Sequence, residues 1–251
     1  MENCQETEFP LPRGLKLSID QGDLLDQPEV YRRIIGRLLY LNVTRPDISY
    51  SVQHLSQFLS QPRLPHFQAA LHVVKYLKGT INVGLFYPAV STLTLTAFSD
   101  ADWVQCQFSC RSLSGYCIFL GDSLVSWKTK KQKTVSKSTA ESEYRSMSYT
   151  TSEMVWLHEL LKDLRVSVPL PIPLHCDNKA AQYIAANPVF HEKTKHLKID
   201  CHYVRDKLLE GFLTTQHISS HMQIADIMTK PLGAQQHKIL SSKLGLQYFP
   251  P

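Results

Sequence analysis

Four acidic residues stand in an order, and on types of element, that suit a shared metal site. Asp100 ends the alternating run 93–100 and Asp177 ends the run 171–177, so both carboxylates are predicted at strand ends beside loops. Glu143 is predicted within a helix, and Asp226 is predicted to open one. Hard divalent cations such as Mg²⁺ prefer carboxylate oxygens, and two of them about 4 Å apart can assist phosphodiester cleavage by activating water and steadying the leaving oxygen. The set therefore predicts metal-dependent phosphodiester chemistry.

The helix predicted over residues 139–164 offers two glutamates for this site. Its inward stripe, at steps of three and four residues, consists of Ala140, Glu143, Met147, Met154, Leu157 and Leu161. Glu141 lies roughly 200° around the helix from Glu143, so the two cannot face the same site. Glu141 also fits a capping box with Ser138 as the N-cap. A carboxylate on a buried stripe needs compensation, so Glu143 is assigned to the site, with Glu141 as the alternative ligand.

Each aspartate also has an ordinary structural interpretation. Asp100 and Asp102 could cap a turn through side-chain hydrogen bonds to the backbone. Asp177 could belong to an N-cap, and Asp226 could be a first-turn acid favoured by the helix dipole. These alternatives stay open for the single residues, whereas the set of four favours a metal site.

Basic residues supply a surface for a polyanion. A first cluster, between a predicted strand and the long helix, holds Lys128, Lys130, Lys131 and Lys133. A second cluster follows the Asp177 segment and includes Lys195 and His196. Both could contact phosphates, although the first could equally be a solvated connection. His191 and His196 are five residues apart, which favours phosphate or scaffold roles over zinc ligation.

The bulk composition describes a folded protein. Of the 251 residues, 43% are hydrophobic, which is ample for a packed core, and the net charge of +5 is compatible with a polyanionic partner. The N-terminus lacks a basic start followed by an apolar segment, and charges interrupt the apolar stretches, so neither secretion nor membrane insertion is expected. The six cysteines include no C-x2-C pair, which favours reduced, structural thiols.

Changes in composition, together with turn-forming and helix-breaking residues, divide the chain into four parts. Residues 1–26 are expected to form a flexible arm, 27–90 a small helical segment, 91–235 a mixed α/β domain, and 236–251 a C-terminal tail or helix. Helices in the second part are expected to turn three groups of residues inward: Tyr31, Ile34, Ile35, Leu38 and Leu39; Ile48, Val52, Leu55 and Leu59; and Phe67, Leu71, Val74 and Leu77.

The α/β part is predicted to open with strands and to continue with helices. The dipeptide Gly121-Asp122 predicts a hairpin between the runs 115–120 and 124–127. After the long helix come a strand ending at Asp177, a helix over 179–186, a helix through 203–209, a strand over 212–218 and a terminal helix.

Several motifs in this chain are characteristic of one family. In chain order they are Phe98-Ser-Asp-Ala-Asp-Trp103, Arg111-Ser-Leu-Ser-Gly-Tyr116, Ser126-Trp-Lys-Thr-Lys-Lys-Gln132, Ser138-Thr-Ala-Glu-Ser-Glu-Tyr144, Cys176-Asp-Asn178, His191-Glu-Lys-Thr-Lys-His196 and Ala225-Asp-Ile-Met-Thr-Lys230. Together they resemble the ribonuclease H region of copia-type LTR retrotransposon Pol polyproteins. Upstream, Tyr31-Arg-Arg-Ile-Ile-Gly36, Thr44-Arg-Pro-Asp47 and Tyr76-Leu-Lys-Gly79 look like the connection or thumb segment that joins the polymerase palm to ribonuclease H.

The resemblance implies a fold, a site and a substrate. The fold would be α/β, a ribonuclease H-like mixed five-stranded sheet with flanking helices, preceded by the small helical segment. Three Asp and one Glu would hold two Mg²⁺ ions, with Mn²⁺ as a substitute, and by motif these are Asp100, Glu143, Asp177 and Asp226. The substrate would be an RNA/DNA hybrid, recognised through 2′-hydroxyls and shape, and the enzyme would cut its RNA strand.

The same resemblance sets the expected context. The chain looks like a C-terminal Pol fragment whose partner would be the palm and fingers of the same polyprotein, in cytoplasmic virus-like particles, with the nucleus as a second location. No Tyr-x-Asp-Asp motif occurs, so reverse transcriptase activity is not expected. Residues 103–110 are more apolar than the Gly- and Asp-containing turn usual in the family, which could affect substrate approach.

Three functions are compatible with the sequence. The first is an active hybrid endoribonuclease, which the intact acidic residues favour. The second is a catalytically silent, nucleic-acid-binding remnant of a retrotransposon. The third is a related nuclease of the same fold, such as an integrase or resolvase, which cleavage of duplex DNA would reveal.

Overall fold

The computed structural model describes residues 4–104, 109–186 and 198–250, with backbone alone for 198–201. The chain divides into two compact units, each described here by itself: unit 1 comprises Met1–Phe86 with Lys230–Pro251, and unit 2 comprises Tyr87–Thr229. The predicted boundary near residue 90 is thus drawn four residues earlier, and residues 230–235 group with unit 1 instead of with the α/β part.

Unit 1 contains the helical segment. Its elements are α1 (Pro28–Leu41), η1 (Pro46–Ile48), α2 (Ser49–Leu55), η2 (Ser56–Phe58), α3 (Leu64–Gly79), β1 (Val83–Leu85), α8 (Ala234–Lys243) and β7 (Leu246–Tyr248). Strand β1 pairs antiparallel with β7, which brings the last described part of the chain back to the helical segment. The proline at the start of α1 suits a first helical turn, where its missing N–H costs nothing.

The segment expected to be a flexible arm contacts α3. Arg63 donates to the carbonyl of Ile19 at 2.7 Å and to that of Gly22 at 2.6 Å. Leu11 and Leu17 are buried. These contacts use backbone carbonyls and two isolated leucines. Since neither produces a periodic sequence pattern, the ordered contacts of this segment were not predicted.

Helix α3 turns a different face inward from the one predicted. Its buried residues are His66, Ala69, Ala70, Val73 and Tyr76, while Phe67, Leu71, Val74 and Leu77 are only partly buried. The two polar members of the buried face have partners: the His66 ring contacts the Arg63 amide and the Ser18 carbonyl, and Tyr76 donates to Asp47. Hydrogen bonding therefore makes their burial possible, which an apolar-stripe prediction does not consider.

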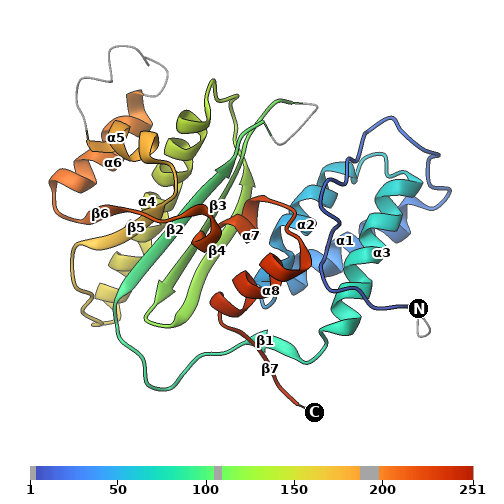
Figure 1. The fold of residues 1–251 in the computed structure, drawn as a ribbon, viewed down its shortest axis with the longest axis horizontal. Helices are drawn as coiled ribbons and strands as arrows, with labels where there is room; N and C mark the ends of the chain where they lie inside the picture. The colour runs from blue at the N-terminus through green and yellow to red at the C-terminus, as the bar shows by residue number, and fades with distance from the viewer. Residues whose placement is uncertain (1–3, 105–108, 187–197, 251) are drawn as a thin grey trace. The chain divides into compact units, whose positions relative to one another are not determined.

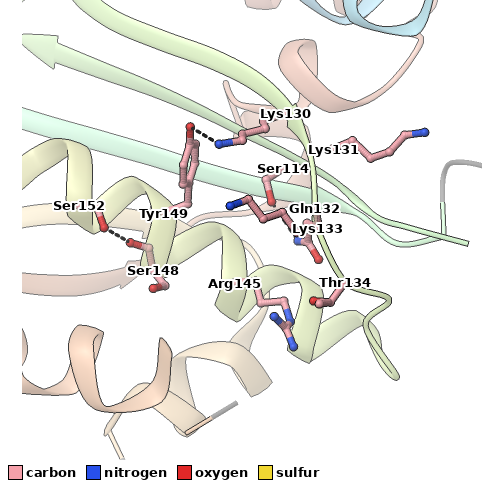
Figure 2. A pocket seen from close by; sticks show the side chains of 10 residues that line it. All are labelled: Ser114, Lys130, Lys131, Gln132, Lys133, Thr134, Arg145, Ser148, Tyr149 and Ser152. Atoms are coloured by element: carbon pink, nitrogen blue, oxygen red, sulfur yellow. Dashed lines mark hydrogen bonds between the residues drawn. The ribbon is translucent and has the colours of Figure 1, made fainter. Parts of the chain in front are cut away.

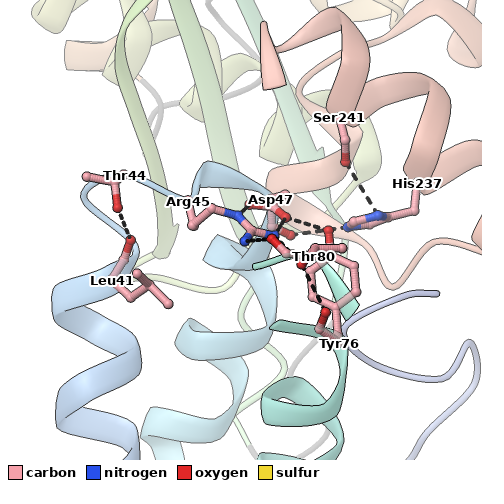
Figure 3. A network of polar contacts seen from close by, with 8 residues as sticks. All are labelled: Leu41, Thr44, Arg45, Asp47, Tyr76, Thr80, His237 and Ser241. Carbon is pink, nitrogen blue, oxygen red and sulfur yellow. Dashed lines mark hydrogen bonds and ion pairs between the residues drawn. The ribbon is translucent and has the colours of Figure 1, made fainter. Parts of the chain in front are cut away.

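A buried ion pair links three elements of unit 1 (Figure 3). Arg45 Nη2 lies 2.7 Å from Asp47 Oδ2, and both side chains are almost completely buried. Tyr76 of α3 donates to the same carboxylate, Arg45 donates to the Thr80 carbonyl at 3.0 Å, and the His237 ring of α8 lies 3.3 Å from the Asp47 carbonyl. The network satisfies two buried charges at once, which such charges require.

Unit 2 is built on a mixed sheet. Its elements are β2 (Leu95–Asp102), β3 (Leu113–Leu120), β4 (Ser123–Lys131), α4 (Thr139–Asp163), β5 (Ile172–Cys176), α5 (Lys179–Ala186), α6 (Lys198–Leu209), β6 (Leu213–His217), η5 (Ser220–Met222) and α7 (Asp226–Thr229). The five strands lie in the order β4-β3-β2-β5-β6; β4, β3 and β2 are antiparallel, and β2, β5 and β6 are parallel. The predicted fold class is confirmed.

Helices cover both faces of this sheet (Figure 1). Tyr116 of β3 packs near Tyr149 of α4, with ring centroids 5.7 Å apart, whereas a Cβ on the neighbouring Gly115 would meet Met228 and Thr229 of α7. Because successive strand residues point to opposite faces, α4 and α7 lie on opposite sides of β3. The apolar core on the α4 side contains Leu95, Ala97, Tyr144, Met147, Ile172 and Leu174.

Among the described residues, no helix combines the length and the apolar character that crossing a bilayer requires.

Candidate active site

Two acidic residues meet where β2 and β5 end. These strands are parallel neighbours, with Ala97 paired to Leu174 and Phe98 to His175. Asp100 therefore lies near the end of one strand, fully buried, and Asp177 directly follows the other, partly exposed. Carboxyl ends of parallel strands share one edge of a sheet, which is why two residues far apart in sequence are brought together.

The structure places the four predicted acids in two overlapping groups. Carboxylate oxygens of Asp100, Asp177 and Asp226 all lie within 4.8 Å of one another. A second group, within the same limit, joins Glu143, the Cys176 thiol and Asp177. Asp177 thus belongs to both groups. Asp100 pairs with Gly115 and faces α7, whereas Glu143 comes from α4 across the sheet, which accounts for the two groups.

Asp100 is held by its surroundings on both side chain and backbone. The Thr229 hydroxyl donates to its Oδ2, and the Ser146 hydroxyl donates to its carbonyl oxygen at 2.8 Å. Just before it, the Ser99 carbonyl accepts from the Gln223 amide at 2.9 Å. A buried carboxylate with such partners belongs to a built site rather than to a solvated turn.

Asp177 and its neighbour divide their tasks. Ser220 donates to Asp177 Oδ2 at 2.7 Å. Asn178 Oδ1 accepts from the Ala181 amide at 3.0 Å, in the manner of a helix cap for α5. The helix cap that Asp177 could have provided is thus provided by Asn178.

Glu143 lies beside a thiol that the sequence analysis treated as structural. Cys176 Sγ is 3.9 Å from Glu143 Oε2. Burial, and then the neighbouring Glu143 carboxylate, raise the pKa of Cys176 above its ordinary value, so the group remains a neutral thiol at pH 7. Its position directly before Asp177, at the end of β5, was the available signal.

Glu141, the alternative ligand, is used by the helix start. Ser138 caps α4 by accepting from the Glu141 amide at 3.1 Å, as predicted. The Glu141 carboxylate accepts from the Lys137 amide at 2.9 Å, one residue before the expected N-cap amide, and pairs with Arg145 at 2.9 Å.

The donor set suits a hard divalent cation. Asp100 and Asp226 are buried, and carboxylates this close repel one another unless protons or cations intervene. Oxygen ligands favour Mg²⁺ or Mn²⁺ over softer metals. Asp100, Asp177 and Asp226 would hold such an ion. Glu143 would add a fourth carboxylate, since it lies in the second group, next to Asp177.

A basic groove lies between β4 and α4 in the same unit (Figure 2). Its cavity of about 430 Å³ is lined by Ser114, Lys130, Lys131, Gln132, Lys133, Thr134, Arg145, Ser148, Tyr149 and Ser152. Lys130 Nζ lies 3.3 Å from the Tyr149 hydroxyl and 4.7 Å from its ring centre, and Lys128 approaches the same ring at 5.9 Å. The Lys131 side chain extends away from Tyr149.

The floor of the groove is polar and buried. Gln132 donates to Ser114 Oγ and to the Ser142 carbonyl, each at 2.9 Å, and accepts from Ser136 at 2.8 Å. Three members of the first predicted basic cluster, Lys130, Lys131 and Lys133, therefore line this groove, and Lys128 lies near the same Tyr149 ring. Lys195 and His196, the second cluster, lie outside the described residues.

Four residues that contact the site were not predicted as site residues: Ser146, which contacts the Asp100 backbone, and Ser220, Gln223 and Thr229. Ser220 and Thr229 contact carboxylates, and Gln223 contacts the strand beside them. They follow no periodic pattern, but Thr229 stands in the motif Ala225-Asp-Ile-Met-Thr-Lys230, and Ser220 and Gln223 lie close to Asp226 in sequence.

Comparison with known proteins gives close relatives over the whole chain, although no family model matches it. The Retrovirus-related Pol polyproteins from transposons RE1 and RE2 of Arabidopsis thaliana are 44% and 42% identical over 251 residues, which is 100% of this chain. The chain spans 17% of the length of each of these two relatives.

Among solved structures, the N-terminal RNase H domain of a Mycobacterium tuberculosis protein, solved as a fusion with maltose-binding protein, matches 60% of this chain and 98% of that chain. The TM-score is 0.38 and the identity 11%. Sequence identity along the full length establishes the relationship: the chain corresponds to a 251-residue segment of the copia-type retrotransposon Pol polyproteins.

Proposed function

We propose that unit 2 is a metal-dependent ribonuclease H that cuts the RNA strand of RNA/DNA hybrids. The observation that carries this proposal is the convergence of Asp100, Asp177 and Asp226, whose carboxylate oxygens lie within 4.8 Å of one another at the ends of two parallel strands. The mixed sheet with its helices and the membership in a Pol family support the same function.

The residues of the chain have separate tasks in this proposal. Asp100 and Asp226, both buried, provide anionic oxygens away from bulk water, and Asp177, partly exposed, provides them where a substrate phosphate can approach. Glu143, buried on α4, adds a further carboxylate beside Asp177. The chemistry that two bound Mg²⁺ ions would supply is the activation of a water and the stabilisation of a leaving oxygen.

The hybrid is proposed as the substrate on grounds of family and chemistry. A ribonuclease H must distinguish RNA from DNA, and the 2′-hydroxyl is the group that allows this at a given site. The palm and fingers of a Pol polyprotein are proposed as the partner that delivers the hybrid, since the relatives are about six times longer than this segment.

The test is cleavage of end-labelled substrates by the purified chain. We expect the wild-type protein with Mg²⁺ to cut the RNA strand of a hybrid and to leave duplex DNA and single-stranded RNA intact. Asp177→Asn, purified in parallel, should leave the hybrid uncut while still binding it, which controls for contaminating nuclease. EDTA should stop the reaction and Mn²⁺ should restore it.

Each other result points to a different function. Binding without cleavage at every Mg²⁺ and Mn²⁺ concentration would favour the silent remnant. Cleavage of duplex DNA would favour an integrase- or resolvase-like nuclease. Cleavage of the hybrid by Asp177→Asn at the wild-type rate would refute the proposed site.

The basic groove is proposed to hold a backbone phosphate of the hybrid. Replacing Lys130 with glutamine should raise the Kd for hybrid several-fold and reduce the slope of log K against log salt by about 1, as expected for one lost phosphate contact. Lys130 is a good candidate because Tyr149 already holds its ammonium group. Fluorescence anisotropy across a salt series measures both quantities.

A matched control comes from the far end of α4. Lys162→Gln makes the same charge change on an exposed side chain that pairs with Glu159. It should leave the affinity and the salt slope close to wild type. If both variants change the slope equally, net charge rather than the groove accounts for binding.

A further inference from the structure

One short segment of unit 2 borders the group formed by Asp100, Asp177 and Asp226. It runs from Ser220 to Thr229 and includes η5 and α7. Along its length it contributes a hydroxyl to Asp177, an amide to the Ser99 carbonyl, the carboxylate of Asp226 and a hydroxyl to Asp100. The segment therefore supplies Asp226 itself and also donates hydrogen bonds to the two strand-end aspartates, Asp100 and Asp177.

Two anchors fix this segment to the sheet. Gln223 is fully buried; its amide donates to the Ser99 carbonyl at 2.9 Å, and its oxygen accepts from the Ala225 amide at 3.2 Å. Thr129 of β4 donates to the Met228 carbonyl at 2.7 Å. Because both the nitrogen and the oxygen of the Gln223 side-chain amide form hydrogen bonds, its orientation is determined. It attaches the segment to Ser99, the residue that precedes Asp100.

Gly115 permits the close approach of α7. A Cβ built on this glycine would lie 2.6 Å from Met228 Cβ and 2.7 Å from Thr229 Cγ2, distances that real Cβ atoms do not show. Gly115 is the register partner of Asp100 on the adjacent strand. The missing side chain thus makes room for Thr229 beside the Asp100 carboxylate.

The Thr229 hydroxyl has a choice of acceptors. It donates to Asp100 Oδ2 at the shortest separation, and the carbonyls of Asp226 and Ala225 lie at 3.3 and 3.5 Å. Back-bonding to a carbonyl three or four residues earlier is common for threonine in helices and would have no bearing on the site. The separation from the Asp100 oxygen is the shortest of the three, which favours Asp100 as the acceptor.

We infer that Thr229 is a positioning residue for the acidic site, since its hydroxyl fixes the Asp100 carboxylate in the orientation that a divalent cation requires. This inference rests on the metal binding in the proposed function. A carboxylate has two oxygens, so accepting from Thr229 leaves capacity for a cation. Hydrogen bonds to metal ligands commonly raise metal affinity 10- to 100-fold by fixing the ligand orientation.

Ser220 plays the same part for Asp177 in a weaker form. The Ser220–Asp177 bond is 2.7 Å long but exposed. Water can replace an exposed hydroxyl, whereas nothing replaces Thr229, which is fully buried. The two hydroxyls therefore form an internal comparison.

The test measures Mn²⁺ binding to the full chain by calorimetry, alongside hybrid cleavage. Thr229→Val keeps the shape and removes the hydroxyl; it should weaken Mn²⁺ binding by about 10- to 100-fold. Thr229→Ser keeps the hydroxyl and should bind within about threefold of wild type, because the hydrogen bond is retained. Ser220→Ala should change the affinity less than Thr229→Val does. Thermal melting without metal checks that each variant is folded, and Thr229→Ala replaces the valine variant if that one is not.

The outcomes separate this inference from the proposed function. Wild-type affinity in Thr229→Val, or equal weakening in the valine and serine variants, would overturn the positioning role. If the wild type binds Mn²⁺ but cuts no hybrid, the proposed function fails while the affinities still decide the role of Thr229. If the wild type binds no Mn²⁺, the positioning role is refuted as well.

Discussion

Replacing Asp100 with asparagine is expected to abolish hybrid cleavage and, in the absence of divalent cations, to stabilise the folded protein. Asp100 is fully buried, and its carboxylate lies in the group whose oxygens are within 4.8 Å of one another. Removing one negative charge relieves repulsion, with an expected gain of about 1 kcal/mol in the free energy of unfolding. Removing a charge that stabilises a transition state costs about 10²- to 10³-fold or more in rate.

The two effects are measured on the same protein samples. Chemical denaturation in EDTA gives the free energy of unfolding, and single-turnover cleavage of labelled hybrid gives the rate. Adding Mg²⁺ should stabilise the wild type and leave Asp100→Asn almost unchanged, because a ligand that binds the folded state adds to its stability.

Asp122→Asn is the matched control for this substitution. Asp122 is exposed in the turn between β3 and β4, so the same chemical change should alter neither stability nor cleavage appreciably. If Asp100→Asn proves destabilising in EDTA, the carboxylate is a structural acceptor and the repulsion argument is wrong. Wild-type cleavage by Asp100→Asn would remove it from the site.

Replacing Asp47 with alanine is expected to destabilise unit 1 by about 3 to 5 kcal/mol, the usual cost of removing one partner of a buried ion pair. In the wild type, Arg45 Nη2 lies 2.7 Å from Asp47 Oδ2. The substitution would leave the Arg45 guanidinium buried without this carboxylate. The Tyr76 hydroxyl would also lose its acceptor. Two buried polar groups would therefore lose their partner at once.

Hydrogen exchange of α3 amides, together with denaturant unfolding, measures this loss. Glu29→Ala serves as the control because its pair with Arg32 is exposed and is expected to contribute less than about 1 kcal/mol. The double variant Arg45→Met/Asp47→Leu should recover much of the stability, since apolar replacement of a whole buried pair is often neutral. An Asp47→Ala protein as stable as Glu29→Ala would contradict the argument.

The elements that carry the site could be predicted because their signals are local. An apolar stripe identified the helix of Glu143, with Met147, Met154 and Leu157 buried as expected, and Gly121-Asp122 marked the hairpin between β3 and β4. The short helix α5 begins at Lys179, as the sequence predicted. In each case, residues within a few positions decide the structure.

What could not be predicted depends on contacts between distant residues. The inward face of α3 follows from hydrogen bonds of His66 and Tyr76 to residues far along the chain. The closeness of Thr229 to Asp100 depends on Gly115, whose role appears only once two strands are in register. Apolar periodicity contains no information about either contact, because both concern polar partners.

The return of the chain to unit 1 after Thr229 sets an order of synthesis. Unit 2 is continuous from Tyr87 to Thr229, whereas the pairing of Val83 with Tyr248 needs residues from both sides of it. A ribosome therefore synthesises every residue of unit 2 before α8 and β7 exist. During translation the pairing of β1 with β7, and with it the completion of unit 1, can therefore take place only after all of unit 2 has been synthesised.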